Sequence, residues 1–226
     1  MKALICFSLL LSFAGGSITN AQTKTKNGLS LFDGKTLNGW RNAQRDTLPD
    51  KAWYVQNSEL IFDPAKGHGG DIITTRSFKS FDLSVQFKIS EGGNSGIKYF
   101  LLPNTSLGCE YQVIDDSRHS DANLGIKGNR KTGALYDIIA ADANKPFKPA
   151  GEWNTARIVV KGNHVQHWLN GVKILEYERG SEAFKQAIAK SKFSTTKGFA
   201  EASSSPVLLQ AHGDKVSYRN INIKEL

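Results

Sequence analysis

The chain has 226 residues, of which 39% are hydrophobic and 22% are charged, and its formal net charge is +8. This length and apolar content suffice for one medium-sized domain with a packed core. The basic residues are scattered and form no run of Lys or Arg interleaved with aromatic residues. We therefore expect no nucleic-acid partner, because such partners require a concentrated basic surface.

The first 21 residues have the three parts of a secretory signal peptide. Lys2 supplies the positive charge, residues 3–14 are apolar, and Thr19-Asn20-Ala21 is a small-residue cleavage site before Gln22. The apolar run is too short to span a membrane. We expect an exported protein, periplasmic or secreted, without membrane insertion. A disordered spacer over residues 22–28 and a single domain over residues 29–226 would follow.

Cys109 is the only cysteine that remains once the signal peptide is removed, so no internal disulfide can form. Its position next to Glu110 suggests a nucleophile. Lone cysteines, however, usually behave as small buried apolar residues, and we favour that role here.

Short strand-like segments separated by turn residues fill the first half of the chain. Every second residue from Phe81 to Ile89 is apolar, which is typical of a half-buried strand. A glycine-rich turn at residues 91–96 follows. The other predicted strands in this half are residues 53–55, 59–62, 71–75 and 97–102.

The stretch from Gly108 to Asp116 predicts a strand with two different faces. Side chains alternate along a strand, so Tyr111 and Val113 face the core while Glu110 and Gln112 share the opposite face. A β-bulge after Gln112 would turn Asp115 to the side of Glu110. The three polar side chains would then line one concave surface. The alternative is a surface strand with a solvated acidic end.

The second half of the chain contains the clearest hairpins. Residues 157–177 form three predicted strands separated by Gly162-Asn163 and Asn170-Gly171, both typical two-residue turns. Residues 117–132 form a long polar loop, which is usually functional or mobile. Residues 133–137, 206–214 and 216–223 are further strand candidates.

One helix is predicted, over residues 181–190, with Ser181 as its N-cap and an apolar stripe at Phe184, Ala187 and Ile188. Many short strands, regular turns and a single short helix predict an all-β protein. The expected fold is a sandwich of two antiparallel sheets.

Several stretches together resemble the 3-keto-disaccharide hydrolase family. The resemblance spans about residues 29–226, and its strength lies in the order of the motifs. They are Asp33-Gly34 through Gly39-Trp40, Asn94-Ser95-Gly96, Glu110-Tyr111-Gln112 with Asp115, Gly151-Glu152-Trp153-Asn154, the hairpin from His164 to Gly171, Leu209-Gln210 with His212-Gly213, and Arg219-Asn220.

The resemblance implies a concanavalin A-like jelly-roll sandwich whose concave sheet binds carbohydrate. It also implies that the substrates are glycosides, such as disaccharides, whose C3 hydroxyl has been oxidised to a ketone by a separate oxidoreductase. The ketone acidifies the hydrogen on C2, so that a base removes it and the C1 substituent leaves. Addition of water completes a net hydrolysis, and without that step the enzyme is a lyase.

Elimination requires a base near C2–H, a group that polarises the ketone, and an acid for the leaving oxygen. The candidates for base and acid are Glu110, Asp115 and His212, because carboxylates and histidines exchange protons near neutral pH. Lys98 or Arg219 would stabilise the enolate oxygen. The predicted substrate-binding residues are Asn94, Lys98, Gln112, Tyr136, Gln210 and Arg219.

A divalent cation is a further candidate for polarising the ketone, although no metal motif of recognised spacing is present. His164 and His167 lie three apart in a predicted strand and therefore on opposite faces, which argues against joint metal ligation.

Three alternatives to the elimination enzyme remain open. They are a carbohydrate-binding module without catalysis, a direct jelly-roll glycoside hydrolase, and a structural surface protein. In a binding module, aromatic side chains would stack on sugar rings, although most of the candidates are expected in the core. These are Trp40, Trp53, Tyr99, Tyr136 and Trp168.

Overall fold

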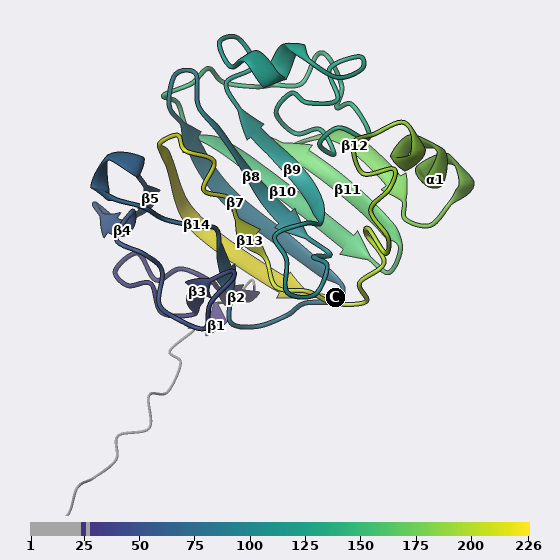
Figure 1. Ribbon diagram of the computed structural model, residues 1–226. Helices are drawn as coiled ribbons and strands as arrows, with labels where there is room; N and C mark the ends of the chain where they lie inside the picture. The colour runs from purple at the N-terminus through teal and green to yellow at the C-terminus, as the bar shows by residue number, and fades with distance from the viewer. Residues whose placement is uncertain (1–23, 26–27) are drawn as a thin grey trace, which may run out of the picture.

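The structure is a computed structural model and describes residues 24–25 and 28–226. Two antiparallel sheets pack face to face, with the single helix of the described residues at one edge (Figure 1). The all-β sandwich expected from the sequence is therefore confirmed. The predicted signal peptide, residues 1–21, lies outside the described residues.

The larger sheet has nine strands, seven of which follow the order β1-β2-β14-β7-β10-β11-β12. The strands β4 and β5 pair with each other, and β5 also pairs with β14. The bounds of these strands are β1 Lys24–Thr25, β2 Gly28–Ser30, β4 Trp53–Gln56, β5 Glu59–Phe62, β7 Phe81–Ile89, β10 Asn154–Lys161, β11 His164–Leu169, β12 Val172–Glu178 and β14 Val216–Glu225.

The smaller sheet has five strands in the order β3-β6-β13-β8-β9. Its three central members join segments that lie far apart in the sequence, because β13 pairs with β6 on one side and with β8 on the other. The strands are β3 Trp40–Asn42, β6 Ile72–Thr74, β8 Asn94–Tyr99, β9 Cys109–Ile114 and β13 Leu208–Leu209.

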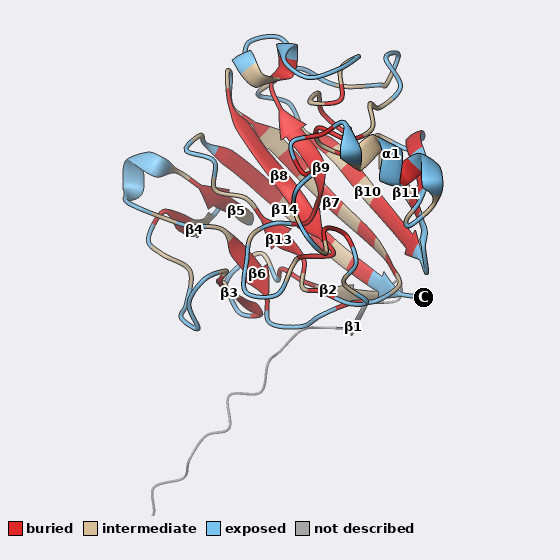
Figure 2. Cartoon of the chain, turned by 45° about the vertical axis from the view of Figure 1, so that its right-hand side comes forward, coloured by how far each residue is buried: buried red, intermediate tan, exposed pale blue. Residues whose placement is uncertain are grey.

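The core lies between the two sheets. Figure 2 shows that the strands facing it are largely buried. In β7 every second residue from Phe81 to Ile89 is buried and the residues between are half-buried, as the apolar period predicts. From the other sheet, Tyr111 of β9 reaches across the core, and its hydroxyl donates to the Trp168 carbonyl oxygen in β11. The assignment of Tyr111 and Val113 to the core face is confirmed.

The predicted turns and helix occur where the local sequence places them. Asn170 and Gly171 have φ values of 48° and 86°, the left-handed conformation that a tight hairpin requires, and they join β11 to β12. The helix α1 spans Glu182–Ala189, and the Ser181 hydroxyl accepts from the Phe184 amide at 3.2 Å. Both signals are local and do not depend on distant contacts.

Several strand boundaries differ from the predictions. The strand predicted at residues 97–102 begins earlier, at Asn94, and ends at Tyr99. The segment 206–214 contributes only the two residues of β13. Within the predicted spacer, Lys24–Thr25 and Gly28 belong to strands, where we had expected disorder. Short strands depend on their neighbours for pairing, and the local sequence does not record those neighbours.

Candidate active site

A polar cavity of about 90 Å³ lies on the five-stranded sheet, on the face opposite the core. The strand register brings its floor together, because Lys98 of β8 pairs with Glu110 of β9, and Gly96 pairs with Gln112. The chain after β13 adds Gln210, whose backbone amide donates to the Gly96 carbonyl oxygen. The lining residues are Asn94, Lys98, Leu107, Gly108, Glu110, Gln112, Tyr136, Lys192, Phe193, Gln210 and His212.

Two buried charged residues, Glu110 and Lys98, and the half-buried Gln210 form a polar triad at the centre of the floor. The Lys98 ammonium lies 3.6 Å from Glu110 Oε2 and donates to the Ser106 carbonyl oxygen at 3.3 Å. With its nitrogen toward Glu110, the Gln210 amide donates to Glu110 Oε1 at 3.2 Å and accepts from Lys98 Nζ at 3.1 Å. Each charge is thus paired, as buried charges must be.

Burial raises the pKa of Glu110, and the nearby Lys98 ammonium opposes this rise. The residue is only 6% exposed. A carboxylate whose pKa is raised binds a proton more strongly, which makes it a better base than an ordinary glutamate. The environment therefore suits Glu110 for proton transfer.

Gly96 leaves the space in which the Glu110 carboxylate lies. A Cβ atom at this position would overlap Glu110 Oε1 and would lie within 3 Å of Cδ and Cγ. The glycine is thus required by the close approach of a side chain from the neighbouring strand.

We expect the substitution Gly96→Ala to lower turnover at least about 100-fold, because it displaces the Glu110 carboxylate by a fraction of an ångström or more. Overpacking of this kind also costs about 1–3 kcal/mol of stability. Steady-state kinetics and thermal unfolding measure the two effects. The control is Gly70→Ala, where the nearest atom to a new Cβ lies 3.6 Å away. Full activity of the Gly96 variant would contradict this placement of Glu110.

Two amide side chains lining the cavity have polar atoms without a partner in the structure. They are both polar atoms of the Gln112 side chain and the Oδ1 atom of Asn94. Gln112 is 1% exposed and Asn94 is 3% exposed. Unpaired buried polar groups are costly, so they mark places where a hydroxylated ligand would supply hydrogen bonds.

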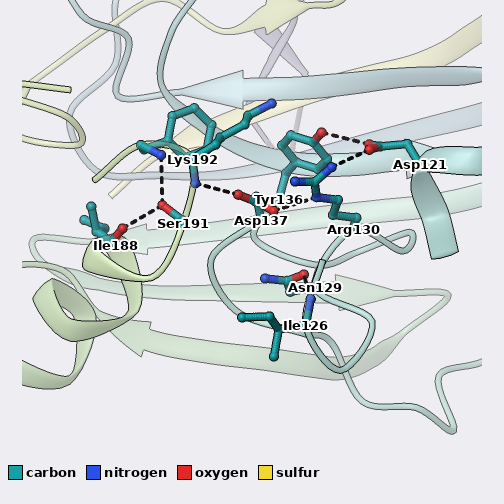
Figure 3. Close-up of polar contacts among 10 residues, drawn as sticks. Asp121, Ile126, Asn129, Arg130, Tyr136, Asp137, Ile188, Ser191 and Lys192 are labelled. Carbon is teal, nitrogen blue, oxygen red and sulfur yellow. Dashed lines mark hydrogen bonds and ion pairs between the residues drawn. The ribbon is translucent and has the colours of Figure 1, made fainter. Parts of the chain in front are cut away.

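Tyr136 and Lys192 reach the cavity from loops and are held by a network of charged residues (Figure 3). The Tyr136 hydroxyl donates to Asp121 Oδ2 at 2.8 Å. Arg130 binds both Asp121 and Asp137 at 2.6 Å. Asp137 Oδ2 in turn accepts from the backbone amide of Lys192 at 2.7 Å, which connects the loop after α1 to the loop after β9.

Lys192 lines the cavity but was not predicted from the sequence. It follows the helix in a polar segment without a motif, and only the Asp137 contact brings it to the cavity. Its ammonium lies 4.1 Å from the centre of the Tyr136 ring, within cation–π range. Loss of hydration lowers the pKa of Lys192, whereas the Glu110 carboxylate opposes this shift.

We expect Lys192→Met to lower turnover at least about tenfold, because it removes a positive charge that faces developing negative charge in the cavity. Lys190→Met is the matched control, since Lys190 is the exposed C-cap of α1. Equal kinetic constants for the two variants would remove Lys192 from the site. Measuring kcat and KM separately would show whether the charge acts on binding or on the chemical step.

Asp115 lies away from the cavity lining, and the expected β-bulge is absent. Pairing of β8 with β9 is regular from Cys109 to Ile114, and the Asp115 amide continues it by donating to the Gly93 carbonyl oxygen. The carboxylate of Asp115 accepts from the amides of Gly92, Ser117 and Arg118 and from the Ser117 hydroxyl. These donors lower its pKa and satisfy it without a bulge.

Arg219 belongs to β14 of the nine-stranded sheet and is likewise not part of the cavity. Its guanidinium donates to Gln86 Oε1 at 2.7 Å and lies 4.0 Å from the Trp153 ring. We therefore leave Asp115 and Arg219 out of the proposed site. The structure brings the other seven predicted residues together: Asn94, Lys98, Glu110, Gln112, Tyr136, Gln210 and His212.

Of the aromatic candidates for sugar stacking, only Tyr136 lines the cavity. Trp40, Trp53 and Tyr99 are buried in the core, and Trp168 is half-buried under the Arg157 guanidinium. Cys109 is also in the core, where burial raises the pKa of its thiol to about 12. Such a thiol is not a nucleophile at neutral pH.

Three potential metal ligands lie beside the cavity. One donor atom from each of His119, His212 and Asp214 lies within 4.8 Å of the other two. His212 is also a lining residue. The sequence offers no sign of this group, because His119 and His212 come from loops far apart in the chain.

The fold and the cavity define an all-β sandwich of two antiparallel sheets with a polar ligand site on one of them. Comparison with known proteins makes the assignment specific. The chain belongs to the family described as the 3-keto-alpha-glucoside-1,2-lyase-like domain, which matches residues 29–224. The resemblance noted in the sequence is thereby confirmed.

Two individual relatives support the same family assignment. A 3-keto-disaccharide hydrolase of Bacteroides thetaiotaomicron is 36% identical over 228 residues, which cover 88% of this chain and 78% of the relative. A crystal structure from Parabacteroides distasonis, provisionally named a glycosyl hydrolase, superposes with a TM-score of 0.76 at 30% identity, covering 87% of this chain and 92% of that one. The chain is thus a glycoside-cleaving hydrolase.

A second Parabacteroides distasonis structure, also provisionally named a glycosyl hydrolase, has a TM-score of 0.64 at 26% identity. The match covers 84% of this chain and 100% of that one.

None of the helices in residues 24–25 and 28–226 has the length and apolar character needed to cross a bilayer.

Proposed function

We propose that this enzyme cleaves 3-keto-glycosides, such as 3-keto-disaccharides, by elimination followed by hydration. The observation that carries the proposal is the polar triad of Glu110, Lys98 and Gln210. Beside it, Gln112 and Asn94 present unpaired polar atoms. The name of the Bacteroides relative supports the same substrate class.

In the first step Glu110 takes the proton from C2, and the electrons of that C–H bond move toward the C3 ketone to form an enolate. Burial raises the pKa of Glu110 and so favours this transfer. The Lys98 ammonium, 3.6 Å from the carboxylate, is placed to stabilise the negative charge on the enolate oxygen.

In the second step the enolate re-forms the ketone, a double bond forms between C1 and C2, and the C1–O bond breaks. The leaving oxygen needs a proton, and His212 at the cavity is the proposed donor. Water then adds to C1 and gives one proton to His212, while Glu110 returns its proton to C2, which yields the 3-keto sugar and restores both side chains. If water does not add, the unsaturated ketone is released and the enzyme is a lyase.

A direct double-displacement mechanism would need two carboxyl groups about 5–5.5 Å apart across the scissile bond. Glu110 is the only carboxylate among the lining residues of the described cavity. The second predicted carboxylate, Asp115, lies outside the lining and accepts hydrogen bonds from backbone amides. The arrangement therefore favours elimination, which needs one strong base.

The proposed substrate implies a partner activity and a location. A 3-keto-glycoside arises when an oxidoreductase oxidises the C3 hydroxyl, so we propose functional coupling to a glycoside 3-oxidoreductase. From the signal-peptide pattern of residues 1–21 we also propose export to the periplasm or beyond. Cell fractionation and the N-terminal sequence of the mature protein test the second proposal.

The decisive experiment incubates the mature protein with a 3-keto-disaccharide and, separately, with its unoxidised parent, and follows products by mass spectrometry. We expect release from the keto form alone, with a product lighter by one water if the enzyme acts as a lyase. Release from the parent would support direct hydrolysis instead. Saccharide binding without release from either would leave a carbohydrate-binding module.

A further inference from the structure

We propose that His119, His212 and Asp214 form a binding site for a divalent transition-metal ion at the edge of the cavity. Their donor atoms lie within 4.8 Å of one another, so small side-chain rotations bring them around one ion. The inference concerns binding and does not rest on the proposed reaction.

The fold holds two of the three ligands in place from different directions. The His119 amide donates to the Asp115 carbonyl oxygen at 3.1 Å, in the turn that the Asp115 carboxylate stabilises. Asp214 Oδ2 accepts from the Asn94 amide at 3.1 Å, which ties the loop before β14 to the start of β8. The two segments meet at the histidine rings, because the ring centres of His119 and His212 lie 6.1 Å apart.

The donor set indicates the class of ion. Two imidazoles and one carboxylate suit Zn²⁺ and its neighbours Co²⁺ and Mn²⁺, whereas Ca²⁺ and Mg²⁺ prefer oxygen ligands alone. Three protein ligands leave at least one coordination position open. Because His212 also lines the cavity, an ion held by these residues would lie next to the space for substrate.

Binding has a structural consequence at His119. Its Nδ1 atom accepts from the Asp121 amide at 3.1 Å and caps the short 3-10 helix Ser120–Asn123. Coordination through Nδ1 uses this lone pair, and coordination through Nε2 moves the ring proton to Nδ1. Either way the Asp121 amide loses its acceptor, so metal binding should loosen this turn.

The test uses tag-free mature protein stripped with a chelator, titrated with Zn²⁺ by calorimetry and with Co²⁺ by visible absorption. We expect one equivalent to bind, and affinity at least tenfold weaker in His119→Ala, His212→Ala and Asp214→Asn. His68→Ala, in an exposed loop, is the control and should bind as the parent does. Circular dichroism verifies that each variant folds.

Hydrogen exchange of the Asp121 amide supplies an independent readout, and it should accelerate when the ion binds. No stoichiometric binding by the parent, or equal binding by all four variants, would overturn the site. If binding depends on all three residues but the exchange of the Asp121 amide is unchanged, the site stands and the predicted loss of the His119 cap is wrong.

A second consequence does rest on the proposed function. A His212 ring whose lone pair coordinates an ion cannot carry the second ring proton that the leaving oxygen needs, so saturating Zn²⁺ should lower turnover at least tenfold. Binding with this inhibition supports both proposals. Binding with unchanged turnover supports the metal site and removes His212 as the proton donor.

Discussion

Replacing Glu110 by Gln is expected to lower turnover of a 3-keto-disaccharide by about 10²–10⁴-fold, the range that a general base contributes. The amide keeps the shape of the side chain but cannot accept the C2 proton. The carboxylate also pairs with Lys98 at 3.6 Å, so a neutral residue leaves that ammonium without its counter-charge. Most of the loss should nevertheless appear in kcat, because the lost step is chemical.

Saccharide affinity should survive this substitution, and calorimetry with the 3-keto ligand measures it. Glu59→Gln is the matched control, since Glu59 pairs with Lys88 on the nine-stranded sheet. An unchanged kcat for the Glu110 variant would mean that another group is the base. Lost affinity with an unchanged kcat would make Glu110 a binding residue.

As the pH falls from 6.5 to 4, His167 alone should lower the free energy of unfolding by about 3 kcal/mol. The reason is that folding lowers the pKa of His167 to about 4. The ring is fully buried and neutral, with Nδ1–H donating to the Gly133 carbonyl oxygen at 2.9 Å and Nε2 accepting from the Tyr99 hydroxyl at 2.6 Å. Burial lowers the pKa of His167 because a charge there would lose its hydration.

The direction follows from proton binding. Between pH 4 and pH 6.5 the unfolded chain holds a proton on His167 and the folded chain does not, so acid favours unfolding. Urea unfolding across this range measures the slope. His167→Gln should flatten it by up to about one proton. Parallel curves for parent and His167→Gln would contradict the prediction.

The face of β9 that lines the cavity could be predicted, because the alternation of side chains along a strand is a local rule. Glu110 and Gln112 point away from the core, as the residues Tyr111 and Val113 between them require. The same rule places Asp115 on the other side, and the bulge that we invoked to move it does not exist. What stabilises Asp115 is a set of backbone amides, one of which belongs to Gly92 in the turn between β7 and β8.

Other members of the site had no local signal of any kind. Lys192 reaches the cavity through the Asp137 contact with its backbone amide, and Asp137 is itself tied to Arg130. Gln210 and His212 entered the sequence analysis through the family resemblance, and their position beside Glu110 depends on the pairing of β13 with β8. Arg219 had the same support, yet its strand belongs to the other sheet.

The sequence by itself determined the class of fold, the two-residue hairpin turns, the capped helix and the alternation in β7 and β9. Each follows from the conformational preference or the apolar period of adjacent residues. Only the tertiary structure decided which strands neighbour one another, and hence that Glu110 meets Lys98 and Gln210, and that His119 meets His212 and Asp214. Such contacts join segments distant in sequence, and they arise when burying both sheets' apolar faces brings those segments together.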